Sequence, residues 1–208
     1  IDPKKTLDAY KAKRGEFRIL EVPSMQYLMI DGAGDPNTAP AYSDAVAALF
    51  PVAYPLKFES RKTLGVDTVV MPLEGLWHAP DMESFTSRRD KSAWLWTLMI
   101  LVPDHVTPEM FAEAVAAVEQ KAAKKKQETP ALRSVRLETL DEGLCVQTLH
   151  VGSYDDEAPV LDDLHHRFIP DNGLRMTGLH HEIYLSDVRR VEPVKLRTIL
   201  RQPVERVG

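Results

Sequence analysis

The sequence has little of what marks several common protein classes. Among its 208 residues Cys145 is the only cysteine, so an internal disulfide and a cysteine-based metal site are both excluded. Its longest uncharged, mostly apolar run, 93–102, is far shorter than the ~20 residues that a membrane-spanning helix needs. No signal-peptide pattern opens the chain. These absences predict a cytoplasmic protein with no membrane partner.

Basic residues are also fewer than acidic ones, 26 against 31. The formal net charge is -5, which opposes nonspecific binding to a polyanion. The lysines at 121 and 124–126 close a helical pattern, where cations suit the negative helix end. Gly32 and Gly34 lack the third glycine of a phosphate-binding loop, and Asp35-Pro36 puts a negative charge where a phosphate would lie. We therefore expect no nucleic-acid partner and no cofactor.

Apolar periodicity divides the chain into strands and helices. Helices are expected at 4–13, 40–58, 107–127 and 159–168, and strands at 17–22, 27–31, 67–78, 94–102, 134–139, 144–151, 180–185 and 196–202. Pro51 and Pro55 predict a kink or an early end in the second helix. Asp141-Glu142-Gly143 predicts a hairpin-like turn between two strands, and 81–92 a polar connector.

The same order of elements occurs twice. Gly32 and Gly152 each follow a strand and lie 120 residues apart, and a helix and two strands follow each glycine. We therefore predict an α+β fold of tandem duplicated β-α-β-β units, with antiparallel sheets and a ligand cleft between the repeats. The expected boundaries within a single domain spanning 1–208 are about 15–104 for repeat one, 107–127 for a linking helix and 133–204 for repeat two. The oligomeric state is left open.

The strand at 180–185 carries the main candidate site. Side chains two residues apart share a strand face, so His180, Glu182 and Tyr184 are predicted to point the same way. Glu182 has three readings: a buried anion for a delocalised cation, a general base that activates water, or an ion-pair partner of Arg189 or Arg190. Tyr184 either assists Glu182 or is part of the core.

Aromatic residues offer the walls of a pocket. Trp77, Trp94 and Trp96 fall on predicted strands, and Tyr54 and Tyr154 are further candidates because they supply area at a low cost in conformational entropy. The adjacent pairs 165–166 and 180–181 are the histidines that suggest a metal. Neighbours on a strand point to opposite faces, and no pair of histidines four apart occurs, so no metal site is expected.

The ordered set of segments 31–37, 71–77, 94–99 and 180–190, with Gly152-Ser153-Tyr154 after a strand, resembles the GyrI-like small-molecule-binding family over about 15–204. The family includes effector domains of multidrug-sensing regulators; unlike those regulators, this chain is expected to carry no DNA-binding domain before its first repeat. The resemblance implies a cleft lined by rings, with Glu182 at its floor, that binds bulky amphipathic and often cationic aromatic molecules. It also implies two alternatives: a hydrolase that opens the cyclopropane ring of DNA-alkylating natural products, with Glu182 as base and Tyr184 assisting, and a protein-binding inhibitor of a topoisomerase.

Overall fold

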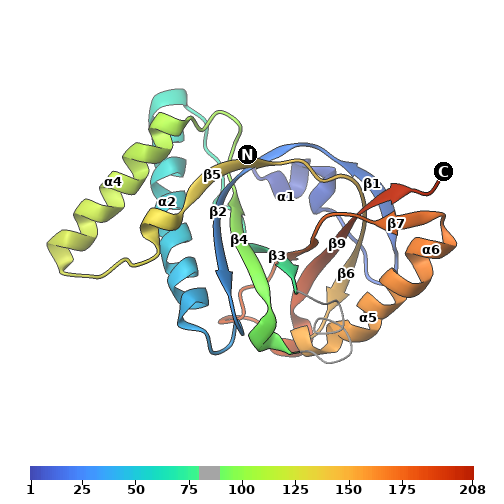
Figure 1. Cartoon of the computed structure of the whole chain (residues 1–208). Coiled ribbons are helices and arrows are strands. Elements are labelled where there is room, and N and C mark those ends of the chain that lie inside the picture. The colour runs from blue at the N-terminus through green and yellow to red at the C-terminus, as the bar shows by residue number, and fades with distance from the viewer. Residues whose placement is uncertain (80–89) are drawn as a thin grey trace.

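The computed structural model describes residues 1–79 and 90–208, and within them nine strands form one sheet system (Figure 1). The strand order is β1-β6-β9-β8-β3-β4-β2-β5, with β7 paired to β9, and every pairing is antiparallel. The strands are β1 (Arg18–Val22), β2 (Met25–Ala33), β3 (Glu74–His78), β4 (Leu95–Leu101), β5 (Arg136–Leu140), β6 (Gly143–Val151), β7 (Leu174–Met176), β8 (His180–Tyr184) and β9 (Arg197–Arg206). The α+β prediction is confirmed.

β1 and β5, the first and last strands of this order, lie in one bent two-stranded ribbon, in which segment 18–29 runs antiparallel to segment 136–147. β1 pairs with β6, from Arg18 opposite Gln147 to Val22 opposite Gly143. β2 continues along the same partner chain and pairs with β5, beginning with Met25 opposite Leu140. The predicted hairpin at 141–143 is therefore wrong. The chain bends there, at Gly143 with φ of 61°, without reversing, because each segment keeps the same partner strand.

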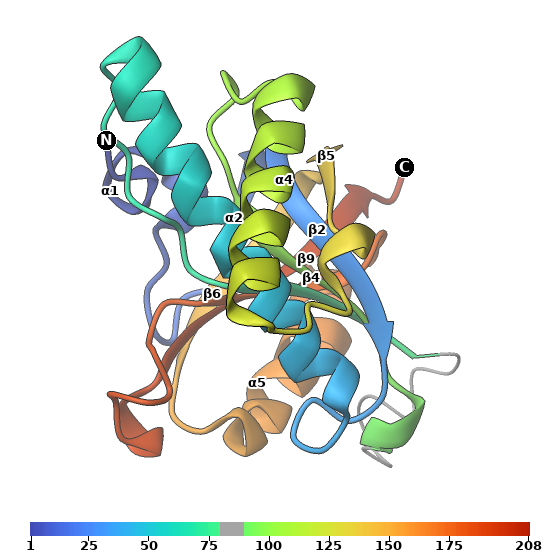
Figure 2. The ribbon, with the colours of Figure 1, turned by 90° about the vertical axis from the view of Figure 1, so that its left-hand side faces the viewer.

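Two helices cover the first half of the sheet. α2 (Pro40–Leu64) packs on β2 and β4, and α4 (Pro108–Lys125) packs outside α2 (Figures 1 and 2). α2 continues through Pro51 and Pro55, so the early end, one of the two outcomes expected at these prolines, does not occur. Burial of an apolar stripe on the sheet outweighs the backbone hydrogen bonds that the prolines remove; the stripe is Ala45, Ala48, Leu49, Val52, Ala53 and Leu56. α4 begins as predicted, with the Thr107 hydroxyl accepting from the Met110 amide at 3.2 Å.

A second helical run covers the other half. It consists of a 3₁₀ turn η4 (Tyr154–Glu157), α5 (Ala158–Asp163), a π-helical turn η5 (Leu164–Phe168) and α6 (Ile169–Asp171). Leu164 and Ile169 pack against Val146 of β6 and Val204 of β9 in a separate small core. This run is longer than the helix predicted at 159–168, because the sequence before Pro159 and after Phe168 also coils.

Three other predictions differ at their ends. The strand expected at 67–78 is regular only from Glu74, and the helix expected at 4–13 is the short α1 (Pro3–Thr6) followed by a 3₁₀ turn η1 (Asp8–Tyr10). β9 continues through Pro203 to Arg206, where the unpredicted β7 joins it. The polar connector expected at 81–92 falls mostly outside the described residues; its described end includes a 3₁₀ turn η2 (Lys91–Ala93).

Apart from the short β7, the main elements follow the same order in the two halves. β2, α2, β3 and β4 are followed later by β6, the helical run 154–171, β8 and β9. The middle strands β3 and β8 pair at the centre of the sheet, with Trp77 opposite His180 and Gly75 opposite Glu182. We propose that the chain is one domain with repeats at about 15–104 and 133–204, joined by α4. The centre of the sheet is then the junction between the repeats.

Candidate functional site

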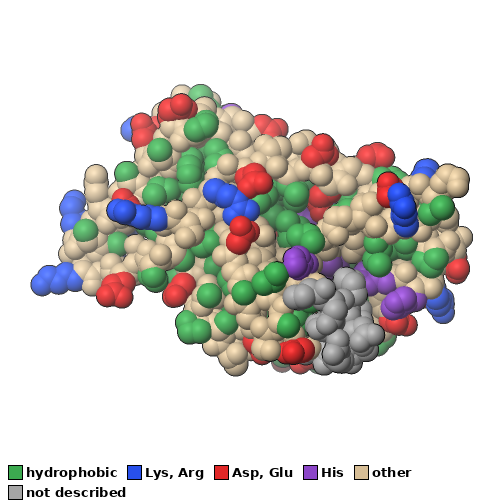
Figure 3. Space-filling view, viewed as in Figure 1, with side chains coloured by type: hydrophobic (Ala, Val, Ile, Leu, Met, Phe, Trp, Pro, Cys, Tyr) green, Lys and Arg blue, Asp and Glu red, His purple; other side chains and the backbone are tan. Residues whose placement is uncertain are grey.

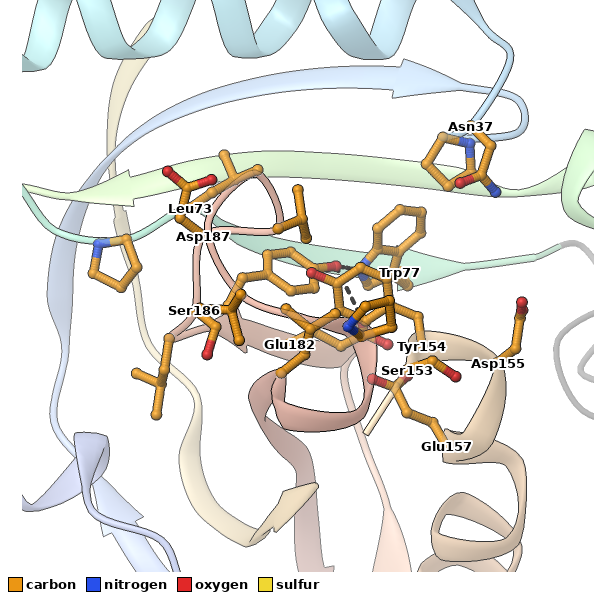
Figure 4. A pocket seen from close by; sticks show the side chains of 18 of the residues that line it. Asn37, Leu73, Trp77, Ser153, Tyr154, Asp155, Glu157, Glu182, Ser186 and Asp187 are labelled. Carbon is orange, nitrogen blue, oxygen red and sulfur yellow. Dashed lines mark hydrogen bonds between the residues drawn. The ribbon is translucent and has the colours of Figure 1, made fainter. Parts of the chain in front are cut away.

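A large cavity lies over this junction (Figure 4). Its volume is about 1530 Å³, and it is lined by residues of α2, β3, η2, η4, α5, β8 and the loop 185–196. Ligand pockets typically measure ~300–1,000 Å³, so this cavity has room for a bulky molecule. Both halves of the chain contribute to its wall.

Glu182 lies at the floor of the cavity and is held by its own strand. Its Oε1 is 3.1 Å from His180 Nε2, and its Oε2 accepts from the Tyr184 hydroxyl at 2.6 Å. The same hydroxyl accepts from Trp77 Nε1 at 2.9 Å. Trp77, Tyr184 and Glu182 thus form one chain of hydrogen bonds across β3 and β8 (Figure 4). As predicted, alternation along β8 places His180, Glu182 and Tyr184 on one face.

Gly75 makes this arrangement possible. It stands opposite Glu182 in the β3–β8 register, and a Cβ there would lie 2.7 Å from Trp77 Nε1. Any larger residue would displace the indole from the Tyr184 hydroxyl. Side chains of the cavity wall therefore approach the backbone closely at Gly75.

The hydrogen bonds set the charge of the floor. Burial raises the pKa of Glu182, but hydrogen bonds and the charge of His180, with hydrogen bonds from Tyr184 and Glu157, bring it below its ordinary value. Burial and the neighbouring Glu182 raise the pKa of Tyr184 well above its ordinary value. At neutral pH the floor therefore holds a carboxylate and a neutral phenol. An ion pair of Glu182 with Arg189 or Arg190 is not formed, because both arginines contact Asp187, at 2.8 and 3.7 Å.

Aromatic rings form the walls around this carboxylate. The ring of Trp94 meets Trp77 edge to face, with centroids 5.6 Å apart, and Tyr42 stacks on Trp77 at 6.3 Å. Tyr154 meets Tyr184 edge to face at 5.5 Å. Tyr42 was missed as a wall residue. Tyr42 stands three residues before Ala45 and so follows the apolar spacing of α2, but that spacing predicts only burial.

The structure separates the predicted wall residues into two groups. Trp77, Trp94 and Tyr154 line the cavity, as does Tyr54, which lies half exposed on α2. Trp96 does not line it.

Trp96 covers Gly32, where a Cβ would lie 2.0 Å from its ring, and its Nε1 donates to the Gly34 carbonyl at 3.2 Å. Its ring meets Tyr42 edge to face at 5.4 Å, so it supports the wall from behind. His180 is also outside the lining set; it lies buried behind Glu182, against His165 with ring centroids 6.2 Å apart.

Charged side chains surround the cavity mouth in pairs. Lys91 contacts Asp155 at 3.2 Å, and Arg189 and Arg190 contact Asp187. On the molecular face of Figure 3, Lys and Arg side chains are likewise scattered among acidic and apolar ones. Among residues 1–79 and 90–208 the mouth therefore presents charges of both signs, while Glu182 lies deeper, at the floor of the cavity.

A second buried network lies on the opposite face of the same strands. His181 bridges Glu74 at 2.8 Å and Glu142 at 2.9 Å, and Arg201 donates to Glu142 at 2.8 Å and to the Ala9 carbonyl at 2.6 Å. This network fastens the N-terminal segment and the β5–β6 bend to the centre of the sheet. His180 and His181 point to opposite faces, as predicted. Within residues 1–79 and 90–208, no group of three or more His, Cys, Asp or Glu side chains could hold a metal ion.

Comparison with known proteins agrees with this geometry. The model of the GyrI-like small molecule binding domain matches residues 15–204. No curated protein matches the sequence. An uncharacterized conserved protein from Listeria innocua is 39% identical, with a TM-score of 0.86 over 99% of this chain and all of that one. A structure described as a hydrolase from the same organism is 37% identical, with a TM-score of 0.82 over 99% of this chain and all of that one.

The similarity extends to a more distant fold relative. The C-terminal domain of EcmrR is 16% identical, with a TM-score of 0.55 over 92% of this chain and 98% of that one; this match shows a shared fold only. In the described part of this chain, no helix has the length and apolar character needed to cross a membrane. The family model and the two Listeria structures cover nearly the whole sequence. The chain belongs to the GyrI-like small-molecule-binding family.

Proposed function

We propose that the cavity binds a bulky amphipathic aromatic molecule, with a preference for cations, and that the protein removes such compounds from the cytoplasm. The observation that carries this proposal is the ionised Glu182 at the floor of a cavity of about 1530 Å³ whose walls include Trp77 and Trp94. Aromatic faces attract a cation through their quadrupoles, by about 0.5–2 kcal/mol each. A carboxylate in a partly desolvated site adds the countercharge.

The contacts of Glu182 narrow the ligand class further. Both carboxylate oxygens already accept hydrogen bonds, from His180 and Tyr184. A ligand therefore gains more from its charge and its flat surface than from new hydrogen-bond donors. This combination favours a delocalised cation, such as a dye-like aromatic cation, over a primary ammonium group that needs three acceptors.

Titration with a rhodamine dye tests the binding proposal. We expect Glu182→Gln to weaken dye binding by at least tenfold, since ~1.4 kcal/mol corresponds to a factor of ten. Glu119→Gln is the matched control: Glu119 lies on α4 and pairs with Arg133 at 3.0 Å, away from the cavity. Equal affinity of the wild type and Glu182→Gln contradicts the proposal.

Hydrolysis is the second candidate, favoured by the relative described as a hydrolase at 37% identity over 99% of this chain. Glu182 takes a proton from water, and the water oxygen forms a bond to a carbon of a strained, electrophilic cyclopropane. A ring C–C bond breaks, its electron pair moves into the conjugated acceptor, and a proton completes the product. The net change is the addition of one water. Tyr184 orients the carboxylate through its 2.6 Å hydrogen bond.

Incubation with a cyclopropane-bearing alkylating agent tests this second candidate. We expect a product heavier by one water, and Glu182→Ala to reduce the rate by about 10²–10⁴-fold, the typical contribution of a general base. Mass spectrometry and the pH dependence of the rate provide the measurements. Absence of turnover by the wild type across such compounds rejects hydrolysis and leaves binding.

A further inference from the structure

One cation of the protein already lies against the aromatic wall of the cavity. Lys91, in the 3₁₀ turn η2, has its ammonium nitrogen 5.8 Å from the centroid of the Trp94 ring. This distance lies within the range of a cation–π contact, up to ~6 Å. Both residues line the cavity, and only 24% of the Lys91 side chain is exposed. A ring that the proposed function assigns to a cationic ligand therefore faces a positive charge of the protein itself.

The turn that carries Lys91 explains this position. Lys91 stands three residues before Trp94, and side chains at this spacing lie above one another in a 3₁₀ turn. The Trp94 amide donates to the Lys91 carbonyl at 3.3 Å. The Asp90 carboxylate caps the turn, because it accepts from the amide of Ser92 at 3.2 Å and from its hydroxyl at 2.6 Å. The backbone therefore holds the stem of Lys91 beside the indole.

A second contact holds the ammonium from the other half of the chain. Lys91 Nζ lies 3.2 Å from a carboxylate oxygen of Asp155, which belongs to η4. Figure 4 shows Asp155 at one side of the cavity and Asp187 at the opposite side. The Asp155 side chain is 76% exposed, and an ion pair with an exposed partner is weak. Because lysine has a flexible four-carbon stem, its ammonium can leave the ring without a change of fold.

We propose that Lys91 is a specificity-determining residue: it occupies the Trp94 ring in the ligand-free protein, and a cationic ligand binds there by displacing it. This inference rests on the proposed binding function and deepens it. A small ammonium ion gains no more from the ring than Lys91 does, and the like charge of Lys91 repels it. A large flat cation adds ring area that the thin lysine stem does not cover. The cavity therefore selects extended polycyclic cations over small ammonium ions.

Titration with a matched pair of dyes tests this role of Lys91. Nile blue and Nile red share one flat ring system, but at pH 7 Nile blue is a cation and Nile red is neutral. We expect Lys91→Met to raise the preference for Nile blue over Nile red by about threefold to thirtyfold, the range of a cation–π contact. Methionine keeps an apolar stem of similar length, and its packing affects both dyes alike. The ratio of the two dissociation constants therefore isolates the effect of the charge.

Two control variants separate the place of the charge from its presence. Lys91→Arg keeps a cation beside Trp94, so its ratio should stay within about twofold of the wild type. Lys195→Met makes the same chemical change in the loop after β8, where Lys195 pairs with Glu192 at 2.7 Å and is not among the described residues that line the cavity. Its ratio should also match the wild type, and thermal melting verifies that each variant folds. An unchanged ratio in Lys91→Met, or an equal rise in Lys195→Met, overturns the inference.

Proton NMR separates failure of this inference from failure of the proposed function. In the ligand-free protein the ring current of Trp94 should shift the ε-methylene protons of Lys91 upfield from those of other lysines, and Trp94→Leu should abolish the shift. Saturation with Nile blue should move these resonances back toward the other lysines. If neither dye binds, the proposed function and the selective role of Lys91 both fall, whereas an upfield shift still establishes that Lys91 occupies the ring. If both dyes bind and the shift is missing without ligand, or persists at saturation, the proposed function stands and this inference is overturned.

Discussion

Removal of one oxygen atom tests how the floor of the cavity is held. The Tyr184 hydroxyl donates to Glu182 at 2.6 Å and accepts from Trp77 Nε1 at 2.9 Å. Tyr184→Phe removes both contacts and leaves the ring in place. Glu182 then loses a donor that favours its charged form, and the indole N–H of Trp77 loses its acceptor.

The magnitude follows from these two contacts. A hydrogen bond to a charged group contributes about 1.5–3 kcal/mol, and a buried donor left unpaired costs about 1–3 kcal/mol. Glu182 and Trp77 both line the cavity, so water that enters it can replace part of the loss. We therefore expect Tyr184→Phe to lower the free energy of unfolding by about 2–3 kcal/mol at pH 7.

This loss depends on pH in a defined direction. The pKa of Glu182 is lowered by folding, so its contribution to stability is present above its unfolded pKa, about 4.3, and disappears as the pH falls through the folded pKa. In Tyr184→Phe the folded pKa moves back up, so the contribution is smaller. The difference between the wild type and the variant should be largest at pH 7 and shrink below about pH 4.

Urea unfolding at pH 7 and at acidic pH provides the measurement. Tyr42→Phe is the matched control, because the Tyr42 ring also lies in the cavity wall, against Trp77, and its hydroxyl makes no hydrogen bond with another described residue. We expect its effect to stay within about 0.5 kcal/mol. A loss in Tyr184→Phe no larger than in Tyr42→Phe, or one that grows toward acidic pH, refutes the reasoning.

Three further predictions concern the structure behind the site. Arg201→Met should lower the free energy of unfolding by about 3–5 kcal/mol, because the buried Glu142 loses one of its two cationic partners and keeps only His181; a urea midpoint close to that of the wild type contradicts this. Gly75→Ala, whose Cβ would lie 2.7 Å from Trp77 Nε1, should weaken rhodamine binding and shift tryptophan fluorescence, and unchanged values would show that the wall yields. Burial alone would lower the pKa of His181, but Glu142 and Glu74 raise it by more than burial lowers it. The pKa of His181 in the folded protein is therefore above its ordinary value. The stability that this histidine contributes is therefore complete below about pH 6.5 and lost as the pH rises through its folded pKa; urea midpoints that rise from pH 6 to pH 9 reject this.

Local periodicity in the sequence correctly predicts how the side chains of β8 are oriented in the site. The two-residue alternation of β8 put His180, Glu182 and Tyr184 on one face, since strand geometry depends only on neighbouring residues. The opposite orientation of His181 follows from the same rule. The start of α4 was equally readable, because its cap is formed by Thr107, next to the helix.

Local sequence patterns do not predict the contacts between segments that lie far apart in the chain. Glu157 lines the same cavity as Glu182 only because the second helical run folds back over the sheet, and no local pattern distinguishes it from the other acids near it. The register that puts Gly75 opposite Glu182 depends on the pairing of β3 with β8, more than 100 residues apart in sequence. The turn residues at 141–143 predict a hairpin, but a turn sequence does not determine whether the strands on its two sides pair with each other.

A crystal structure with the rhodamine dye bound would test the central claim most directly. The account predicts density for the dye in the cavity between the two repeats, with its rings against Trp77 and Trp94 and its charged portion facing Glu182. The same soak of Glu182→Gln should leave the cavity empty or weakly occupied. Density for the dye at another place on the wild-type protein, or equal occupancy in both proteins, would contradict the account.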